Sequence, residues 1–499
     1  MATNNPSSSS FCPPPPSMAT TNPEKSSPPA KKARKEGESF ELPPLTHYLP
    51  EDILEIAMTL LPLKEAARFS TVATRFSRTW CFNRKFIFGR ELSLRNDQQA
   101  HTTLVDRMFE SHQGNEIQCF QVHVDPIGVE QLIMKWLRIC GEKKTEDVLL
   151  NFLRRGFRLS PDDIDCLSES LKSLNLVRCG IMMPPVTRSM QFLHTVILKQ
   201  VELVSDQLES LVWHCRALVN LELFQCRGLQ SVRIYARAHR HLRTVKVSGC
   251  AGVNWMMIDA PTIKCFFFAG VRPTILFGDF GEVYLQEAIF NFVPAKGARG
   301  AGFTKHYRVE ALVNILYHVT TLTISAHFLE SLSARIRLGW VFRGSSFTLA
   351  HLRELQLFME TSSYCSPYDI LLFVKNCPNI ERLFIDMHNF DFNGGVYWEV
   401  HQKPKLDEFN GYFNQLRTVK IKGFKFGRCE LVLVKYLLQR SMVLEHLILV
   451  TQKFEEFAFA PKWIYLFHSW KASPMLNIHL YGQSSDKSGV NPTHSKRLR

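Results

Sequence analysis

The sequence predicts an α/β protein in which a small helical module is followed by a solenoid, a curved parallel sheet with helices or irregular returns outside. Three observations predict this architecture. A helical pattern near residue 50 is too short to fold alone. From about residue 117 an apolar pattern returns about eleven times, and each copy fits a short strand. The 499 residues, 45% hydrophobic and 21% charged, have the composition of a globular chain with one long core.

Residues 1–44 form a tail that is rich in Pro and Ser and poor in aromatic residues, so we expect it to be disordered. Within it, Lys31, Lys32, Arg34 and Lys35 make a compact basic run that resembles a nuclear import signal. A solvated cluster of charges is the alternative interpretation. If the run is a signal, the protein is expected in the nucleus as well as the cytoplasm.

A helical module is predicted over residues 45–85. Its apolar residues recur at the spacing of one helical face, at Ile53, Ile56, Ala57, Leu60 and Leu61. Pro50 suits the first turn of this helix, and Pro62 ends it because proline has no N–H to donate. A unit this small cannot bury its apolar surface within itself, so it must pack against another domain or bind a partner.

The long domain, residues 117–409, and its continuation repeat an apolar residue, two variable residues, an apolar residue, one variable residue and an apolar residue. Copies begin at Leu171, Leu193, Leu218, Leu229, Leu242, Ile263, Val319, Leu352, Ile380, Leu416 and Leu444. The copies at Leu171, Leu193, Leu218 and Leu242 are 22, 25 and 24 residues apart, which is the period of a leucine-rich repeat. No repeat can bury its apolar face alone, so the copies must stack.

Basic residues are predicted on the concave face of this solenoid. Side chains alternate across a strand, so the residues between the apolar positions must face the concave side of the sheet. This register places Arg233, Lys246, Arg382 and Lys420 there, beside Glu222 and Glu354. With a formal net charge of +14, we expect this face to bind an acidic or phosphorylated protein segment. A generally basic surface without a focused patch is the alternative.

The helical module resembles the F-box of plant F-box proteins. Residues 48–80 carry, in order, Leu-Pro-acidic-acidic-Ile-Leu, Leu-Leu-Pro, Lys-Glu-Ala, Arg-aromatic and a final Trp. The resemblance implies that the module binds a Skp-type adaptor. The residues implied in that contact are Leu49, Pro50, Ile53, Leu54, Leu60, Leu61, Pro62, Val72, Phe76 and Trp80.

Residues 410–455 resemble the FBD segment of the same plant proteins. The matching stretches are residues 416–424, 430–438 and 443–445, which predict a strand, a turn at Gly423, a helix over about residues 430–440 and a second strand. The order F-box, leucine-rich repeats, FBD matches that family over almost the whole chain. We expect residues 86–116 to connect the F-box to the repeats, residues 456–484 to cap the solenoid and residues 485–499 to be disordered.

The sequence predicts no catalytic motif, metal site or cofactor. The 13 cysteines are scattered without a C-x-x-C pair, which favours a reducing compartment without disulfides. No apolar run approaches the roughly 18–20 residues of a membrane span, so no membrane partner is expected. The family resemblance implies a non-catalytic subunit of an SCF-type ubiquitin ligase, joined through the Skp-type adaptor to cullin and RING subunits and holding a protein substrate for degradation.

Two other functions stay open. The net charge and the basic tail run suggest a nuclear nucleic-acid-binding regulator, but the chain has no zinc-finger, helix-turn-helix or RNP-like motif, so nucleic acid is not the expected partner. A small-molecule receptor with its pocket in the solenoid is the other alternative, although no residue points to a particular ligand.

Overall fold

The structure is a computed structural model. It describes residues 50, 53, 56, 57, 61, 63–71, 79–91, 97–167, 169–182, 189–278, 283–293, 312, 315–337, 348–359, 365–392, 399–400, 403–408, 410–451, 460–483 and 486–496. The chain divides into two compact units, residues 1–51 and 52–499. All the helices and strands described below belong to the second unit, which is considered by itself.

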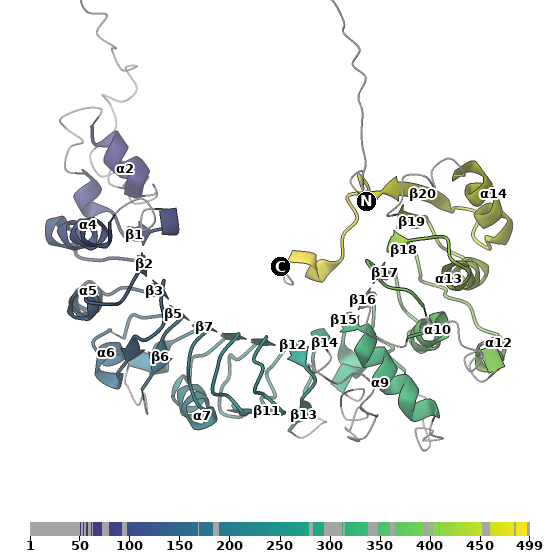
Figure 1. Ribbon diagram of the computed structural model, residues 1–499, viewed down its shortest axis with the longest axis horizontal. Helices are drawn as coiled ribbons and strands as arrows, with labels where there is room; N and C mark the ends of the chain where they lie inside the picture. The colour runs from purple at the N-terminus through teal and green to yellow at the C-terminus, as the bar shows by residue number, and fades with distance from the viewer. Residues whose placement is uncertain are drawn as a thin grey trace, which may run out of the picture. The chain divides into compact units, whose positions relative to one another are not determined.

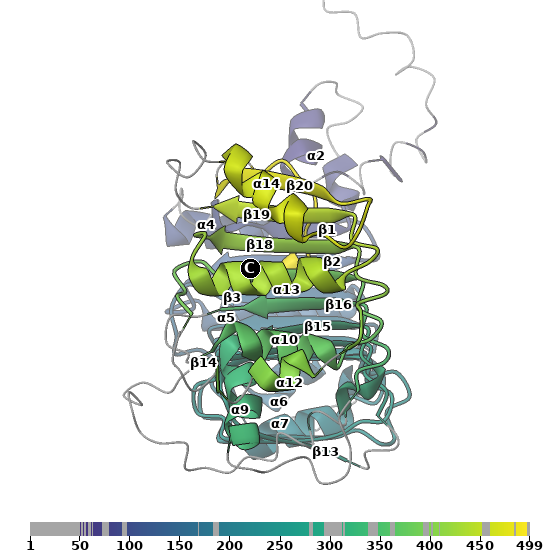
Figure 2. The same ribbon diagram turned by 90° about the vertical axis from the view of Figure 1, so that its right-hand side faces the viewer.

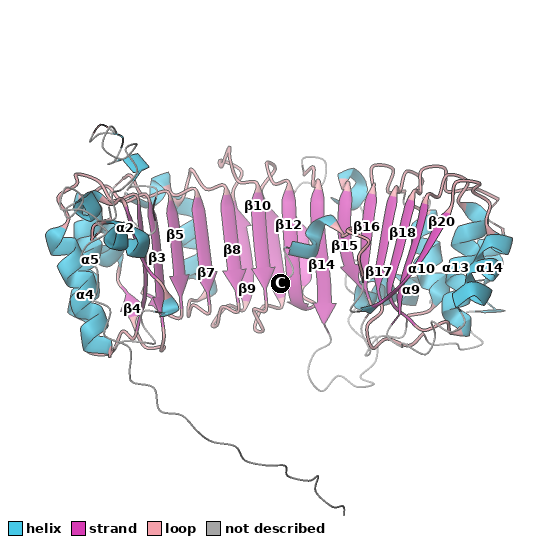
Figure 3. Cartoon of the chain, turned by 90° about the horizontal axis from the view of Figure 1, so that it is seen from above, coloured by secondary structure: helices cyan, strands magenta, loops and turns pink. Residues whose placement is uncertain are grey.

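A parallel sheet of 15 strands organises the described part of the second unit. In spatial order its strands are β1 (Lys85–Phe88), β2 (Cys119–Val124), β3 (Asp147–Phe152), β5 (Ser173–Val177), β7 (Thr195–Lys199), β8 (Asn220–Phe224), β10 (Thr244–Ser248), β12 (Cys265–Val271), β14 (Glu287–Val293), β15 (Thr321–Ser325), β16 (Glu354–Phe358), β17 (Arg382–Asp386), β18 (Thr418–Phe424), β19 (His446–Thr451) and β20 (Asn477–Gly482). Neighbours in space follow one another along the chain (Figure 3). The predicted α/β class and curved parallel sheet are confirmed.

Helices cover the outer side of this sheet, while the strands line the inner side of the curve (Figure 1). The α-helices are α2 (Leu63–Phe69), α4 (Gln98–Ser111), α5 (Glu130–Glu142), α6 (Pro161–Asp165), α7 (Ser205–His214), α9 (Ala326–Arg337), α10 (Pro367–Lys375), α12 (Lys403–Asp407), α13 (Arg428–Arg440) and α14 (Ala460–Trp470). The 3₁₀ helices are η3 (Thr79–Phe82), η4 (Ser189–Phe192), η5 (Leu316–His318) and η8 (Thr493–Lys496). No helix within the described ranges is both long and apolar enough to cross a bilayer.

A second parallel sheet replaces helices on the outer side near the middle of the array (Figure 1). Its strands are β9 (Ser231–Tyr235), β11 (Trp255–Asp259) and β13 (Thr274–Phe277), and a separate pair is formed by β4 (Arg158–Leu159) and β6 (Gly180–Ile181). The repeat copy predicted to begin at Leu229 therefore supplies β9 of this second sheet and no strand of the main sheet. The prediction that Arg233 lies on the concave face is wrong for the same reason.

Local sequence explains where strands and helices form. In β7, Val196 and Leu198 are buried in the core, and the residues on either side of them are only partly buried. Helix α10 begins at a Ser-Pro-x-Asp motif, in which the Ser366 hydroxyl accepts the Asp369 N–H and Pro367 occupies the first turn. This capping box satisfies helix N–H groups that have no partner within the helix. Ser160 caps α6 in the same way.

The FBD-like segment continues the solenoid with the elements predicted for it. Strand β18, helix α13 and strand β19 follow in order, and Figure 2 shows α13 lying in front of the stacked strands. Gly423 adopts a φ of +76° where the pairing of β18 with β19 shifts register. The expected terminal cap includes α14 and β20, so it adds a further helix and strand to the array.

Two predicted boundaries are wrong. The connecting segment, residues 86–116, belongs to the solenoid, because β1 is the first strand of the main sheet and α4 packs behind it. Residues 486–496 are not a disordered tail, because they make hydrogen bonds to the strands of the main sheet. We call residues 486–496 the C-terminal segment.

The predicted helical module is described only in part. Helix α2 and the helical residues 53, 56 and 57 lie within the described ranges, whereas residues 1–44 lie outside them. The buried side chain of Asn83 joins this module to the solenoid. Its amide donates to the backbone oxygen of Leu61 at 3.2 Å, and its side-chain oxygen accepts the N–H of Lys85 at 2.7 Å.

Candidate functional site

The concave face changes character towards the C-terminal end of the sheet. In β7 the concave positions are partly exposed, but in β15, β16 and β18 the corresponding positions are buried although they are polar. Pairing between neighbouring strands sets Thr323, Gln356, Phe384 and Lys420 in one row and Glu354 and Arg382 in the adjacent row. Buried polar groups need partners, so something must cover these rows.

The cover is the C-terminal segment, which lies inside the curve of strands (Figure 1). Three groups at its start contact Nζ of Lys420. A carboxylate oxygen of Asp486 lies at 2.8 Å, the Ser488 hydroxyl at 2.7 Å and the backbone oxygen of Val490 at 2.7 Å. An ammonium group has three N–H donors, so this set satisfies it. Lys420 is only 1% exposed.

The contact with Lys420 favours the ionised form of Asp486. Burial by itself would raise the pKa of Asp486, but hydrogen bonds from Lys420 and Ser488 outweigh burial and hold the pKa below the ordinary value of a carboxyl group. The segment therefore presents a carboxylate to the one lysine that the sheet buries at this point.

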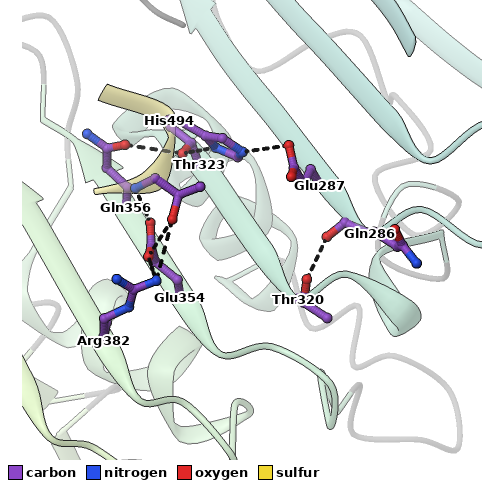
Figure 4. Close-up of polar contacts among 9 residues, drawn as sticks. Gln286, Glu287, Thr320, Thr323, Glu354, Gln356, Arg382 and His494 are labelled. Atoms are coloured by element: carbon purple, nitrogen blue, oxygen red, sulfur yellow. Dashed lines mark hydrogen bonds and ion pairs between the residues drawn. The ribbon is translucent and has the colours of Figure 1, made fainter. Parts of the chain in front are cut away.

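A second anchor is the buried carboxylate of Glu354 (Figure 4). One of its oxygens accepts the backbone N–H of Thr493 at 2.6 Å, and the other accepts the Thr493 hydroxyl at 2.9 Å. The same carboxylate pairs with Arg382 of the next strand. Glu354 thus recognises the backbone and side chain of one residue together, and Arg382 balances its charge.

The third anchor is the side chain of His494, which is fully buried. Its Nδ1 lies 2.8 Å from the Thr323 hydroxyl, and its Nε2 lies 3.6 Å from a carboxylate oxygen of Glu287 (Figure 4). The imidazole meets the ring of Phe267 edge to face, with centroids 5.6 Å apart. We call Phe267, Glu287, Thr323, Glu354, Arg382 and Lys420 the covered site.

The segment does not fill all the space beneath it. A cavity of about 270 Å³ remains beside the covered site, lined by Gln356, Phe384, Asp386 and Lys422 of the strands and Pro492 and Ser495 of the segment. The cavity offers both aromatic and charged groups, and its volume is just below the range of about 300–1,000 Å³ that is typical of small-molecule sites.

The four basic residues predicted for substrate binding do not form one patch. Arg382 and Lys420 lie on adjacent strands and both contact the C-terminal segment. Lys246 is on the concave face of β10, where Nζ pairs with Glu222 at 2.5 Å and lies over the ring of Phe267. Arg233 is on β9, where it pairs with Glu209 of helix α7 at 3.1 Å. The expected basic face is therefore neutralised wherever these cations lie.

The residues predicted to bind the adaptor fall mostly outside the described part of the chain. Of the ten, Pro50, Ile53, Leu61 and Trp80 are described. Ile53 is 47% exposed and the neighbouring Ile56 is 61% exposed, so two isoleucines of the predicted apolar face are accessible. The four residues of the predicted import signal lie outside the described ranges.

Sequence reasoning missed Thr323, Glu287 and His494. The available signal was weak: a polar residue lies between Leu322 and Ile324 at the centre of an apolar strand, where it can only point to the concave side. Nothing around His494 distinguishes it from the other histidines. The arrangement as a whole contacts a chain segment that ends in a 3₁₀ helix through two carboxylates, a lysine and an arginine. Within the described ranges, no group of three or more His, Cys, Asp or Glu is placed to hold a metal ion.

Comparison with known proteins gives consistent matches. The family model described as At1g61320/AtMIF1, LRR domain, matches residues 108–462. The chain is 27% identical over 409 residues to the putative FBD-associated F-box protein At1g61330 of Arabidopsis thaliana, covering 80% of this chain and 89% of the relative. It is 28% identical over 413 residues to the FBD-associated F-box protein At1g61320 of the same plant, covering 80% and 87%. The F-box/FBD/LRR-repeat protein At1g78750 is 23% identical over 448 residues, covering 80% and 88%.

Proposed function

Because this chain belongs to the plant family of F-box proteins with leucine-rich repeats and an FBD segment, we propose that it is the substrate-recognition subunit of an SCF-type cullin–RING ubiquitin ligase. The F-box docks on a Skp-type adaptor, and the solenoid holds a protein substrate for ubiquitination and proteasomal degradation. The subunit itself performs no chemistry. It accelerates ubiquitin transfer by raising the local concentration of substrate lysines near the loaded conjugating enzyme.

One observation carries the substrate-binding part of this proposal. The concave face already holds a peptide, the C-terminal segment, which ends in the 3₁₀ helix η8, through side chains of β14, β15, β16 and β18. A surface that satisfies the backbone N–H, hydroxyl and carboxylate groups of one chain segment is suited to hold another. Lys420 favours an acidic or phosphorylated segment, since the carboxylate of Asp486 is what Lys420 binds here.

Adaptor binding is tested by co-purification. The double variant L49A/P50A should retain less than about a tenth of the wild-type amount of a Skp-type adaptor, because truncating central apolar anchors of an interface costs about 2 kcal/mol or more. The matched control is E146A/K172A, which removes an exposed ion pair of the solenoid with Nζ and carboxylate 2.6 Å apart. Undiminished adaptor recovery with L49A/P50A would contradict the proposal.

The nucleic-acid alternative is weakened by the pairing of the concave cations. Lys246 is paired with Glu222, and Arg382 with Glu354, so neither offers an uncompensated charge to a phosphate backbone. The small-molecule alternative keeps one observation in its favour, the cavity of about 270 Å³ beside the covered site. A rise in the melting temperature of the full chain on screening small acidic aromatic compounds would support it.

We also propose that the basic run of the tail directs part of the protein to the nucleus, with the rest in the cytoplasm. A fluorescent fusion with Lys31, Lys32, Arg34 and Lys35 changed to alanine should lose its nuclear signal. A fusion that stays as nuclear as the wild type would contradict the import role.

A further inference from the structure

We propose that the C-terminal segment is a built-in competitor for the covered site, and that its own groups specify the chemistry of the partner. That partner is a protein segment that gives a carboxylate to Lys420 and, about seven residues later, an N–H and a hydroxyl to Glu354 from the start of a 3₁₀ turn. A ring follows, to lie against Phe267 between Thr323 and Glu287. The inference rests on the proposed function, in which the concave face holds a protein substrate.

The contacts of the segment are of a kind that another chain can reproduce. Lys420 binds a carboxylate, a hydroxyl and a backbone oxygen, while Glu354 binds a backbone N–H and a hydroxyl. Such groups occur in any segment of suitable sequence. Only His494 and Pro492 of the described segment are buried, so little apolar area holds it in place. Segments with few buried apolar contacts open at the low end of a protein's stability range.

Release of the segment would change the charge of the site. Among the described residues, the groups in contact with Nζ of Lys420 all belong to the C-terminal segment. When the segment leaves, this ammonium loses these three partners and is exposed to water. A carboxylate or phosphate can make charge-assisted hydrogen bonds to this ammonium, so the open site favours an acidic partner or return of the segment.

The connection to β20 makes the segment an effective competitor. Strand β20 ends at Gly482 and the segment begins at Asp486, so the tether is short. A ligand tethered in this way acts at an effective concentration in the millimolar range. A partner therefore binds with an apparent dissociation constant equal to its intrinsic constant divided by the open fraction of the site. A partner segment that binds the covered site weakly is therefore excluded. A partner displaces residues 486–496 only if it binds the site more favourably than they do.

The first test measures the intact wild-type chain. Hydrogen exchange should show slowed exchange at the Thr493 amide, which donates to Glu354 at 2.6 Å. Exchange as fast as in the free peptide of residues 486–496 would overturn the proposal without any variant being made.

The second test uses a fluorescein-labelled peptide of residues 486–496 as the probe and full-length chains as receptors. The release variant D486A/H494A removes the carboxylate and the buried ring, and the control K487A/N491A makes the same number of changes at exposed neighbouring positions. The probe should bind the release variant at least about tenfold more tightly than it binds the wild type or the control. Adding Lys420→Gln or Glu354→Gln to the release variant should abolish that gain.

Equal affinity for all chains, or a gain that survives Lys420→Gln, would overturn the proposal. Circular dichroism and the melting temperature establish whether each variant folds. If a variant does not fold, the hydrogen-exchange measurement on the wild-type chain still tests the proposal. These tests contain no adaptor, so loss of adaptor binding would defeat the proposed ligase role and leave this result intact. Conversely, if the C-terminal segment never occupies the covered site, the competitor proposal fails, but adaptor binding and the proposed ligase role are unaffected.

Discussion

The ammonium group of Lys420 lies 2.8 Å from a carboxylate oxygen of Asp486, which brings the inner face of strand β18 into contact with the end of the chain. This pair joins a cation that is 1% exposed to an anion whose pKa it helps to lower. The pair forms only while the C-terminal segment covers the sheet. Loss of the ion pair should therefore affect the order of this segment before it affects the rest of the fold.

Asp486→Asn should loosen the segment without unfolding the solenoid. Breaking a buried ion pair costs about 3–5 kcal/mol when the remaining charge stays buried, but here Lys420 regains water as the segment lifts. Amide exchange within residues 486–496 should accelerate by about tenfold or more while the melting temperature changes little. Asp391→Asn is the control, because the Asp391 carboxylate that pairs with Lys425 is 84% exposed. A large fall in melting temperature would show that the segment is integral to the fold.

Gly423→Ala should destabilise the protein more than Gly128→Ala. Their φ angles are nearly the same, +76° and +77°, so both substitutions strain the backbone by about 1–2 kcal/mol. At Gly128 an added Cβ has nothing within 4 Å, whereas at Gly423 it lies 2.7 Å from the carbonyl carbon of Met387. The clash should add about 1–3 kcal/mol. Urea unfolding of the two variants measures the difference, and equal losses would refute the packing argument.

Acidification should destabilise the N-terminal repeats. Burial, followed by the positive charge of Lys143, lowers the pKa of His112 to about 4, and burial also lowers the pKa of His101 and His123. Between pH 6.5 and pH 4 the unfolded chain binds a proton at residue 112 that the folded chain does not, so unfolding is favoured as the pH falls. His112 alone should remove about 2 kcal/mol between pH 7 and pH 5.

The measurement is the free energy of unfolding by urea at pH 7, 6 and 5. The variant His112→Gln should show a shallower pH dependence than the wild type. The control His241→Gln changes an exposed histidine and should keep the wild-type slope. An unchanged slope in His112→Gln would assign the pH dependence to other groups.

Lys246→Glu should weaken substrate capture, and Arg233→Glu should not. Lys246 lies on the concave face beside Glu222, so the substitution places two carboxylates together where an acidic segment is expected to bind. Arg233 belongs to the second sheet and faces helix α7. Affinity capture from plant extract, with proteasome and cullin activity inhibited, should give about fivefold less substrate with Lys246→Glu. Equal loss with both variants would point to a general effect of net charge.

Strand positions could be predicted from sequence because apolar alternation has one physical cause. In each repeat, residues such as Val419 and Ile421 must enter the core, and their spacing shows this directly. The same rule misplaced Arg233, since β9 buries Val232 and Ile234 just as β10 buries Val245 and Val247. Both sheets line one core, so alternation cannot say which of them a strand joins.

The covered site could not be predicted because it is made by contacts between distant parts of the chain. Residues 486–496 have the polar, Gly- and Pro-containing composition of a disordered tail. Their order comes from Lys420, Glu354 and Thr323, which lie on three different strands. Of the four predicted basic residues, Arg382 and Lys420 contact the C-terminal segment, Lys420 through Asp486 and Arg382 through Thr493. Their role in substrate binding stays a prediction.

The path of the C-terminal segment also bears on how this end of the array unfolds. In a stack of repeats each repeat is stabilised only by contacts with its two neighbours, so terminal repeats can unfold separately from the rest. The segment breaks this pattern, because it contacts Glu287 on β14, Thr323 on β15, Glu354 on β16, Arg382 on β17 and Lys420 on β18. It thus couples five consecutive strands into one cooperative block. A partner that replaced it without spanning the same strands would leave this end of the solenoid more open to local unfolding and proteolysis.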